Sequence, residues 1–170
     1  MPEVTLRPMT AEEFDVYFPW AKAEYADEVR RNTGISADAA ARRSERSFRH
    51  LVPEGVDTPG HKLWVATDPE TGARVGLIWL TLQQLRGEDA MWINDIYVEE
   101  PLRGRGYGRR LLEFAEAEAR RAGVLRMELN VAGDNAGARS LYESIGYTEM
   151  SRQMYKTLPP ASRGGELRPQ

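Results

Sequence analysis

The residues with the clearest chemical potential form a glycine-rich stretch, residues 103–109, which reads Arg-Gly-Arg-Gly-Tyr-Gly-Arg. An apolar, β-branched run precedes it and stops at Pro101, and residues with helical spacing follow it. A strand, a glycine loop and a helix N-terminus in this order direct unpaired backbone N–H groups and the positive end of a helix dipole toward an anion. The stretch is therefore a candidate phosphate site.

The glycine spacing excludes the two commonest nucleotide sites. A dinucleotide fingerprint needs Gly-x-Gly-x-x-Gly, but the glycines stand at positions 104, 106 and 108, and position 109 is arginine. A P-loop needs Gly-Lys-Ser/Thr, and no such triplet stands near the stretch. The pattern that remains is Arg103-x-x-Gly106-x-Gly108 between a strand and a helix.

This pattern resembles the acetyl-CoA-binding motif of the Gcn5-related N-acetyltransferase superfamily, Arg/Gln-x-x-Gly-x-Gly/Ala. Residues 135–147 resemble a second signature of that family, Asn-x-x-Ala-x-x-Leu-Tyr-Glu-x-x-Gly-Phe, with Tyr147 in place of the usual phenylalanine. Two motifs at the expected separation are far more specific than either alone. The resemblance covers roughly residues 62–158, whereas the first sixty residues match only in layout.

The resemblance implies a site for acetyl-CoA. In the family, backbone groups of the strand before the loop pair with the pantetheine arm, and backbone N–H groups of the loop hold the pyrophosphate. The strands at residues 91–98 and 126–131 would splay apart to admit the arm. The implied cofactor-binding residues are Ile96, Tyr97, Val98, Arg103, Gly104, Arg105, Gly106, Tyr107, Gly108, Arg109, Asn135 and Tyr142.

The implied reaction is direct acetyl transfer to a primary amine of a small molecule or peptide. Tyr142 is the expected general acid for the departing thiolate, and Asp95 is the candidate general base by its position. Glu99, Glu100 or a chain of water molecules are alternatives for the base. A protein of the same fold that binds an acyl-CoA without turnover is the alternative function. The acceptor and the length of the acyl group stay open.

Each assignment has a purely structural alternative. The three glycines could form a tight strand-to-helix turn and nothing more. Tyr142 could be a core aromatic residue, and Asn135 could be a helix N-cap in addition to a ligand for pantetheine. The arginines of the loop could form a solvated basic face.

The elements that must position these residues follow from periodicity and turn signals. A helix begins at Thr10, whose spacing to Glu13 is that of a capping box, and Pro19 is expected to break it into two pieces. A second helix runs from Ser36 to Pro53. Further helices are expected at about Gly108–Ala122 and after Asn135. The expected strands are Val4–Arg7, Lys62–Thr67, Arg74–Gln83, Met91–Val98, Leu125–Val131 and Tyr147–Leu158.

The order β-α-α-β-β-β-α-β-α-β predicts an α/β (α+β) fold with a mixed, mostly antiparallel sheet flanked by helices. The crossover helix between residues 92 and 131 predicts one parallel strand pair. Residues 1–158 are expected to form a single N-acetyltransferase domain. Residues 159–170, which are polar and rich in proline and glycine, are expected to form a disordered tail.

Composition restricts the remaining possibilities. The 170 residues include no cysteine and only two histidines, so disulfides, cysteine nucleophiles and zinc-thiolate sites are excluded. No metal site is expected, although a site made of carboxylates stays open. The net charge of −3 does not suggest a nucleic-acid partner. No apolar run approaches the ~18 residues of a membrane span, and the N-terminus does not resemble a signal peptide, so a cytoplasmic protein is expected. The resemblance also makes a homodimer possible.

Overall fold

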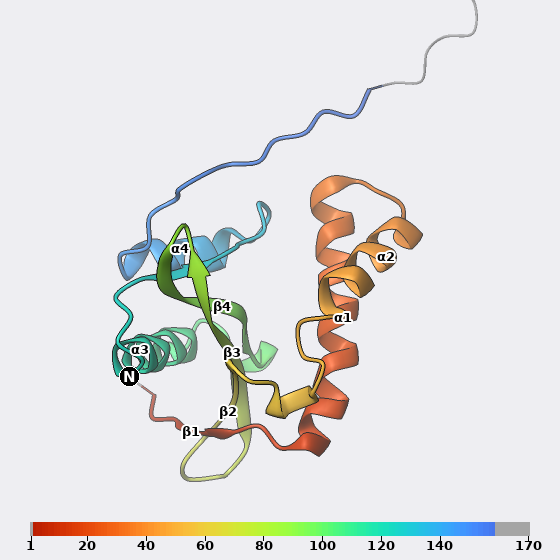
Figure 1. The fold of residues 1–170 in the computed structure, drawn as a ribbon. Helices are drawn as coiled ribbons and strands as arrows, with labels where there is room; N and C mark the ends of the chain where they lie inside the picture. Colours follow the sequence, from red (N-terminus) through yellow and green to blue (C-terminus); the bar gives the residue numbers. More distant parts are fainter. Residues whose placement is uncertain (1, 159–170) are drawn as a thin grey trace, which may run out of the picture.

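The computed structural model describes residues 2–158, which form a five-stranded sheet with helices on both faces. Helices α1 and α2 cover one face of the sheet, and α3 and α4 cover the other (Figure 1). In chain order, the elements are β1 (Thr5–Pro8), α1 (Ala11–Thr33), α2 (Ala37–Phe48), the 3-10 helix η1 (Gly55–Asp57), β2 (His61–Thr67), β3 (Arg74–Leu85), β4 (Glu88–Val98), the 3-10 helix η2 (Glu100–Leu102), α3 (Tyr107–Arg121), β5 (Met127–Leu129) and α4 (Ala136–Ser144).

The sheet confirms the predicted mixed architecture. The strands lie in the order β1-β2-β3-β4-β5. The first three pairings are antiparallel, and β4 and β5 are parallel, with α3 as the crossover between them. The predicted parallel pair is therefore present, in a fold of the α/β class.

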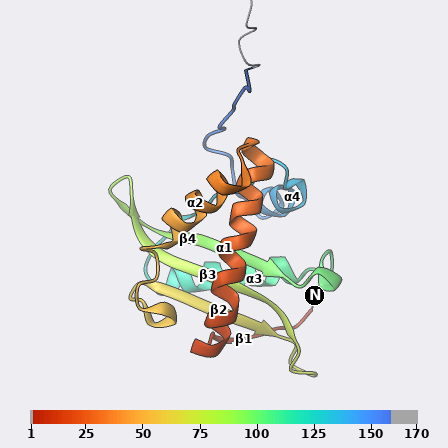
Figure 2. The same ribbon diagram turned by 90° about the vertical axis from the view of Figure 1, so that its right-hand side faces the viewer.

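The two faces of β3 bury alternate side chains against different helices, as the two-residue period of a strand requires. Leu77 and Trp79 contribute to a core shared with α1. Ile78 and Leu80 contribute to a core shared with α3 and α4. Figure 2 shows that the long helix α1 runs across the strands on one face of the sheet, and that α2 lies on the same face. The central strands thus hold both helical layers in fixed positions.

The expected break of the first helix at Pro19 is wrong, because α1 runs without interruption from Ala11 to Thr33. Pro19 lies on the exposed side of the helix. Proline has no N–H group, so the carbonyl group of Asp15 lacks its usual hydrogen-bond donor. Asp15 is also exposed, so water can replace that donor. Phe14 and Tyr17 before the proline and Ala21 after it stay buried on the same face, so packing against the sheet holds the helix together.

The expected last strand, Tyr147–Leu158, is also wrong, because its residues form no strand of the described sheet. Met150, Met154, Tyr155 and Leu158 are exposed along a segment that extends away from the domain (Figure 1). Their spacing of four, one and three residues does not alternate, so they present no apolar strand face. The predicted tail, residues 159–170, lies outside the described residues.

Two elements are shorter than expected. α2 ends at Phe48 rather than near Pro53. The strand predicted at Leu125–Val131 is limited to Met127–Leu129, because β5 pairs with β4 over only three positions. Among the described residues, no helix combines the length and apolar character needed to cross a membrane.

Candidate active site

The N-terminus of α3 has the geometry of an anion site. Gly106 is the N-cap residue, with a φ angle of 92°, and it supplies no side-chain cap. The N–H groups of the first helical turn have no partner within their own helix, so they are available to an external acceptor. Gly108 also allows close packing, since a Cβ atom there would lie 2.9 Å from Leu141 of α4.

Two arginine side chains hold the loop in place through hydrogen bonds. Arg103 donates from Nε to the carbonyl oxygen of Val98 at 3.1 Å, and its guanidinium lies 5.5 Å from the centre of the Tyr97 ring. Arg109 donates to Ser144 Oγ of α4 at 2.8 Å. These two side chains thus connect the loop to β4 and α4, whereas Gly104 and Arg105 are exposed.

The sheet opens beside this loop. The register between β4 and β5 ends at the pair Ile93 and Leu129, so the last part of β4 continues beyond its parallel neighbour. On its other side, the same part of β4 stays paired with β3 through Ile96, Tyr97 and Val98. This part of β4 therefore has one edge that β5 does not cover, at the place where the resemblance puts the pantetheine arm. The arm can pair with a strand through its amides.

A β-bulge in β4 lies where the sheet opens. The register shifts between Trp79 and Leu80 of β3, whose partners are Asp95 and Ile93, so Asn94 is the extra residue. A bulge changes the direction of the side chains next to it. The Nδ2 atom of Asn94 donates to Thr81 Oγ1, and Asp95 accepts a hydrogen bond from helix α1.

Asp95 is a partly buried carboxylate with a defined partner. The Tyr17 hydroxyl donates to its Oδ2 atom at 2.7 Å. Burial raises the pKa of Asp95, and the hydrogen bond from Tyr17 opposes that shift. A carboxylate with a raised pKa is a stronger base than a free aspartate, as a proton acceptor near neutral pH requires.

Tyr142 lies on α4, buried beside the ring of Tyr147, with 5.5 Å between the ring centres. Its pKa is raised to about 12, first by burial and then by the negative charges of Asp95 and Glu28. The phenol therefore keeps its proton at neutral pH. The influence of Asp95 on Tyr142 also means that the two predicted catalytic side chains lie in the same part of the molecule.

Asn135 is the N-cap of α4, as the structural alternative stated, and its Oδ1 atom accepts from the N–H of Ala138 at 3.0 Å. Capping engages only the oxygen of the side-chain amide. The nitrogen Nδ2 is the atom that could donate to a pantetheine carbonyl. The capping role and the predicted binding role are therefore compatible.

Two further groups near the site lie on α1, outside both family signatures. One is Tyr17, and the other is Glu28, whose pKa is raised by burial and by the nearby charge of Asp134. The C-terminus of α1 is joined to the segment before α4 by Asn32, whose Nδ2 atom donates to Asp134 Oδ1 at 3.0 Å. The helical period places Tyr17 on the buried face of α1, but no local signal pairs it with Asp95.

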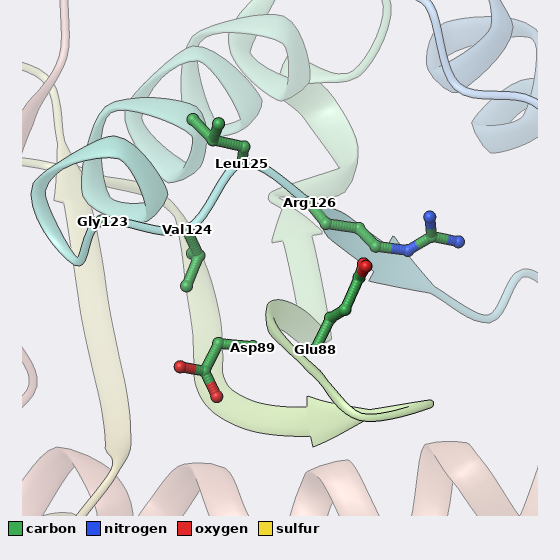
Figure 3. A pocket seen from close by; sticks show the side chains of 6 residues that line it. All are labelled: Glu88, Asp89, Gly123, Val124, Leu125 and Arg126. Atoms are coloured by element: carbon green, nitrogen blue, oxygen red, sulfur yellow. The ribbon is translucent and has the colours of Figure 1, made fainter.

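A hollow elsewhere on the molecule is separate from this site. It lies between the start of β4 and the segment that joins α3 to β5 (Figure 3). None of the predicted site residues lines it; the lining residues are Glu88, Asp89, Gly123, Val124, Leu125 and Arg126. Within residues 2–158, no cluster of three or more carboxylate or histidine side chains could hold a metal ion.

Comparison with known proteins identifies the family. The sequence profile of the acetyltransferase (GNAT) family matches residues 11–147. The chain is 34% identical to YycN of Bacillus subtilis (strain 168), an uncharacterised N-acetyltransferase, over 156 residues that cover 91% of this chain and 99% of that protein. YdgE, an uncharacterised N-acetyltransferase of the same strain, is 29% identical over 154 residues, which cover 91% and 98% of the two chains.

Solved structures agree with the sequence comparison. The crystal structure of YycN matches with a TM-score of 0.84 and 32% identity, and covers 92% of this chain and 99% of that one. An acetyltransferase of Clostridium acetobutylicum, solved with acetyl-CoA, shares the fold with a TM-score of 0.59 at 14% identity, over 91% and 96% of the chains. Acetyl-CoA is the acetyl donor of this family. The chain therefore belongs to the acetyltransferase (GNAT) family, and it is an enzyme of the N-acetyltransferase class.

Proposed function

We propose that this enzyme transfers an acetyl group from acetyl-CoA directly to a primary amine of a small molecule or peptide, with both substrates bound at once. One observation supports the proposal: Asp95, a carboxylate with a raised pKa, lies on β4 beyond its last pair with β5, and its charge acts on the protonated phenol of Tyr142. These are the two kinds of group that aminolysis of a thioester requires.

The residues present fit acetyl-CoA as the donor. The uncapped first turn of α3 offers N–H groups to the pyrophosphate, and the loop residues Arg103 to Arg109 surround it. The free edge of β4 offers backbone groups of Ile96, Tyr97 and Val98 to the pantetheine arm. Asn135 lies at the start of α4, and its side-chain nitrogen Nδ2, which takes no part in the cap, would donate to a carbonyl of the arm.

Asp95 acts as the base in this proposal. The acceptor amine must lose a proton to attack the thioester carbon, and the Asp95 carboxylate accepts it. The carbon–nitrogen bond then forms as negative charge develops on the carbonyl oxygen. Backbone N–H groups at the end of β4 can stabilise that charge, because donors aimed at a developing oxyanion are effective in a partly dry site.

Tyr142 completes the transfer as the acid. The carbon–sulfur bond breaks, and the sulfur leaves with the electron pair. The Tyr142 hydroxyl, which keeps its proton at neutral pH because its pKa is about 12, gives that proton to the sulfur. The tyrosinate then takes up the second proton that the nitrogen loses as the amide forms. Since the base and the acid are different residues, proton acceptance and donation can take place within one ternary complex.

The acceptor side of the site is acidic. Glu24 acts electrostatically on Asp95, and Asp95 and Asp134 act on Glu28. Arg31, which pairs with Asp134 at 3.5 Å, offsets only part of this charge. This negative potential would attract an acceptor that arrives as an ammonium ion. We therefore propose a cationic amine as the class of acceptor.

A two-step experiment tests the function. Isothermal titration with acetyl-CoA should show binding, and the release of CoA thiol should then follow the addition of amines from a panel of diamines, amino acids and peptides. Binding without thiol release for every amine would favour the alternative, an acyl-CoA-binding protein without turnover. Failure to bind any acyl-CoA would contradict both functions.

A further inference from the structure

Tyr17 makes a contact that the family signatures do not contain. Its ring is buried between α1 and the sheet, with the ring centres of Trp20 and Trp79 at 6.0 and 6.5 Å. From this fixed position its hydroxyl donates to Asp95 Oδ2 at 2.7 Å. The contact joins the first helix to the strand that carries the proposed base.

We propose that Tyr17 is a positioning residue for acetyl transfer, which holds the Asp95 carboxylate in one orientation and in its ionised form. Through Oδ2 the carboxylate is anchored to α1, which fixes the orientation in which it meets the acceptor amine. This inference rests on the proposed function of Asp95 as the base. It adds a residue from the N-terminal part of the chain, which contains neither of the two family signatures.

The surroundings of Asp95 support this role because they restrain the residue from both sides. On the sheet side, the bulge is held by Asn94, whose side chain donates to Thr81 Oγ1. On the helix side, the Tyr17 ring packs among core residues and loses little further freedom when its hydroxyl binds the carboxylate. Orientation of a catalytic group by a packed neighbour is a common source of acceleration.

The Tyr17 hydroxyl opposes the groups near Asp95 that disfavour its charged form. Burial and the carboxylate of Glu24 disfavour the charged form of Asp95, whereas the Tyr17 hydroxyl and the N–H of Ile96 favour it. The other charged or titratable groups that act on this region or border it are Glu28 and Arg31 of α1, Tyr142 of α4, Asp134 before α4, and His61 of β2, which accepts a hydrogen bond from the indole of Trp79. None of these five groups donates a hydrogen bond to Asp95 in the described structure.

These opposing influences on Asp95 determine in which direction its pKa changes when the Tyr17 hydroxyl is lost. Loss of the Tyr17 hydroxyl removes a contact that lowers the pKa of Asp95, so that pKa rises further. The base is active only when ionised, so the acidic limb of the profile of kcat/KM against pH moves to higher pH. At a pH below that limb, kcat/KM should fall roughly tenfold, the size of effect typical of a hydrogen bond to a charged group.

The test compares Tyr17→Phe with Tyr25→Phe. Both substitutions remove one hydroxyl from α1 and keep the ring, and Tyr25 packs on Phe48 of α2, with 5.7 Å between ring centres. Tyr17→Phe should move the acidic limb to higher pH and leave the acetyl-CoA Kd unchanged, whereas Tyr25→Phe should leave both unchanged. An equal loss at every pH, without a shift of the limb, would reduce Tyr17 to a structural residue and overturn the proposal.

A direct titration separates this inference from the proposed function. Carbon-13 NMR of the Asp95 carboxyl, without substrates, should show a higher pKa in Tyr17→Phe than in the parent enzyme, and an unchanged pKa would overturn the role of Tyr17. Full turnover and an unchanged acidic limb in Asp95→Asn would instead remove Asp95 as the base, and with it any catalytic role for Tyr17.

A second replacement at position 17 distinguishes the proposed effect from a folding defect in Tyr17→Phe. A ring-fluorinated tyrosine at position 17 keeps the ring and the hydroxyl but donates a stronger hydrogen bond. It should move the acidic limb to lower pH, opposite to the shift in Tyr17→Phe. A shift in the same direction as Tyr17→Phe would overturn the proposal.

Discussion

Tyr142 shows how a single residue acquires its chemistry from its surroundings. The phenol is buried on α4, and the carboxylates of Asp95 and Glu28 further disfavour its ionised form. In Tyr142→Phe we expect kcat to fall about a hundredfold or more, the usual contribution of a general acid, with little change in acetyl-CoA affinity. Stopped-flow release of CoA thiol and isothermal titration measure the two quantities separately.

The matched control for this prediction is Tyr147→Phe. Tyr147 lies beside Tyr142 with its ring tilted by 54°, and its pKa is likewise raised to about 12, mainly by burial. This variant should retain most of its turnover, since Tyr147 has no assigned proton transfer. Equal turnover in the two variants would remove Tyr142 from the proposed mechanism.

Gly106 is the second position where one residue determines a site. With a φ angle of 92°, a side chain at this N-cap would be strained and would lie 3.3 Å from Pro2. Gly106→Ala should shift the first turn of α3 and weaken acetyl-CoA binding roughly tenfold. Gly123→Ala, at the other end of α3, has a similar φ angle of 77° and open space around it, so it should keep the parent Kd in isothermal titration.

At the scale of elements, α1 is held both by local signals at its N-terminus and by its packing. Its N-terminus has the predicted capping box, in which Glu13 N donates to Thr10 Oγ1 and Thr10 N donates to Glu13 Oε2. The same Glu13 pairs with Arg7, at 2.6 Å, and thus joins the helix to β1. The capped N-terminus and the buried face together keep the helix continuous across Pro19.

Pro19 still lowers the stability of α1 locally, and a substitution at this position can remove that energetic cost. Pro19→Ala restores the backbone donor to the Asp15 carbonyl, and the exposed ring makes no core contact that would be lost. We expect the free energy of unfolding to rise by about 1–3 kcal/mol. Urea denaturation measures this change. Pro101→Ala, in the first turn of η2 where proline is well tolerated, should change it much less.

At the scale of the whole molecule, buried tyrosines link stability to alkaline pH. Tyr142 and Tyr147 both have pKa values of about 12 in the folded enzyme, above the ordinary value of 10. The folded state therefore binds their protons more tightly than the unfolded state does. Their stabilising effect is complete below pH ~10 and is lost as pH rises from there toward 12.

This linkage predicts a measurable loss of stability in base. Urea denaturation between neutral pH and pH ~11 should show a falling free energy of unfolding for the parent enzyme. The double variant Tyr142→Phe with Tyr147→Phe should have a flatter dependence in the same range. Parallel curves for the two proteins would show that other groups control the alkaline limit.

The elements that sequence predicted well are those whose signals lie close together in the chain. The caps at Thr10, Ser36 and Asn135 each use a partner three residues away. The glycine loop, the crossover helix and the parallel strand pair followed from turn chemistry and the rules of chain connection. The strand at Tyr147–Leu158 failed because a strand needs a partner, and apolar residues alone do not supply one.

By itself, the sequence determined the family, the order of most elements and the loop that contains Gly106, because short-range contacts and residue types define these features. Only the tertiary structure decided that α1 stays continuous across Pro19 and that Tyr17 donates to Asp95, 78 positions along the chain. It also decided where β4 separates from β5. Such features depend on which distant surfaces pack together, and no local pattern of residues encodes that.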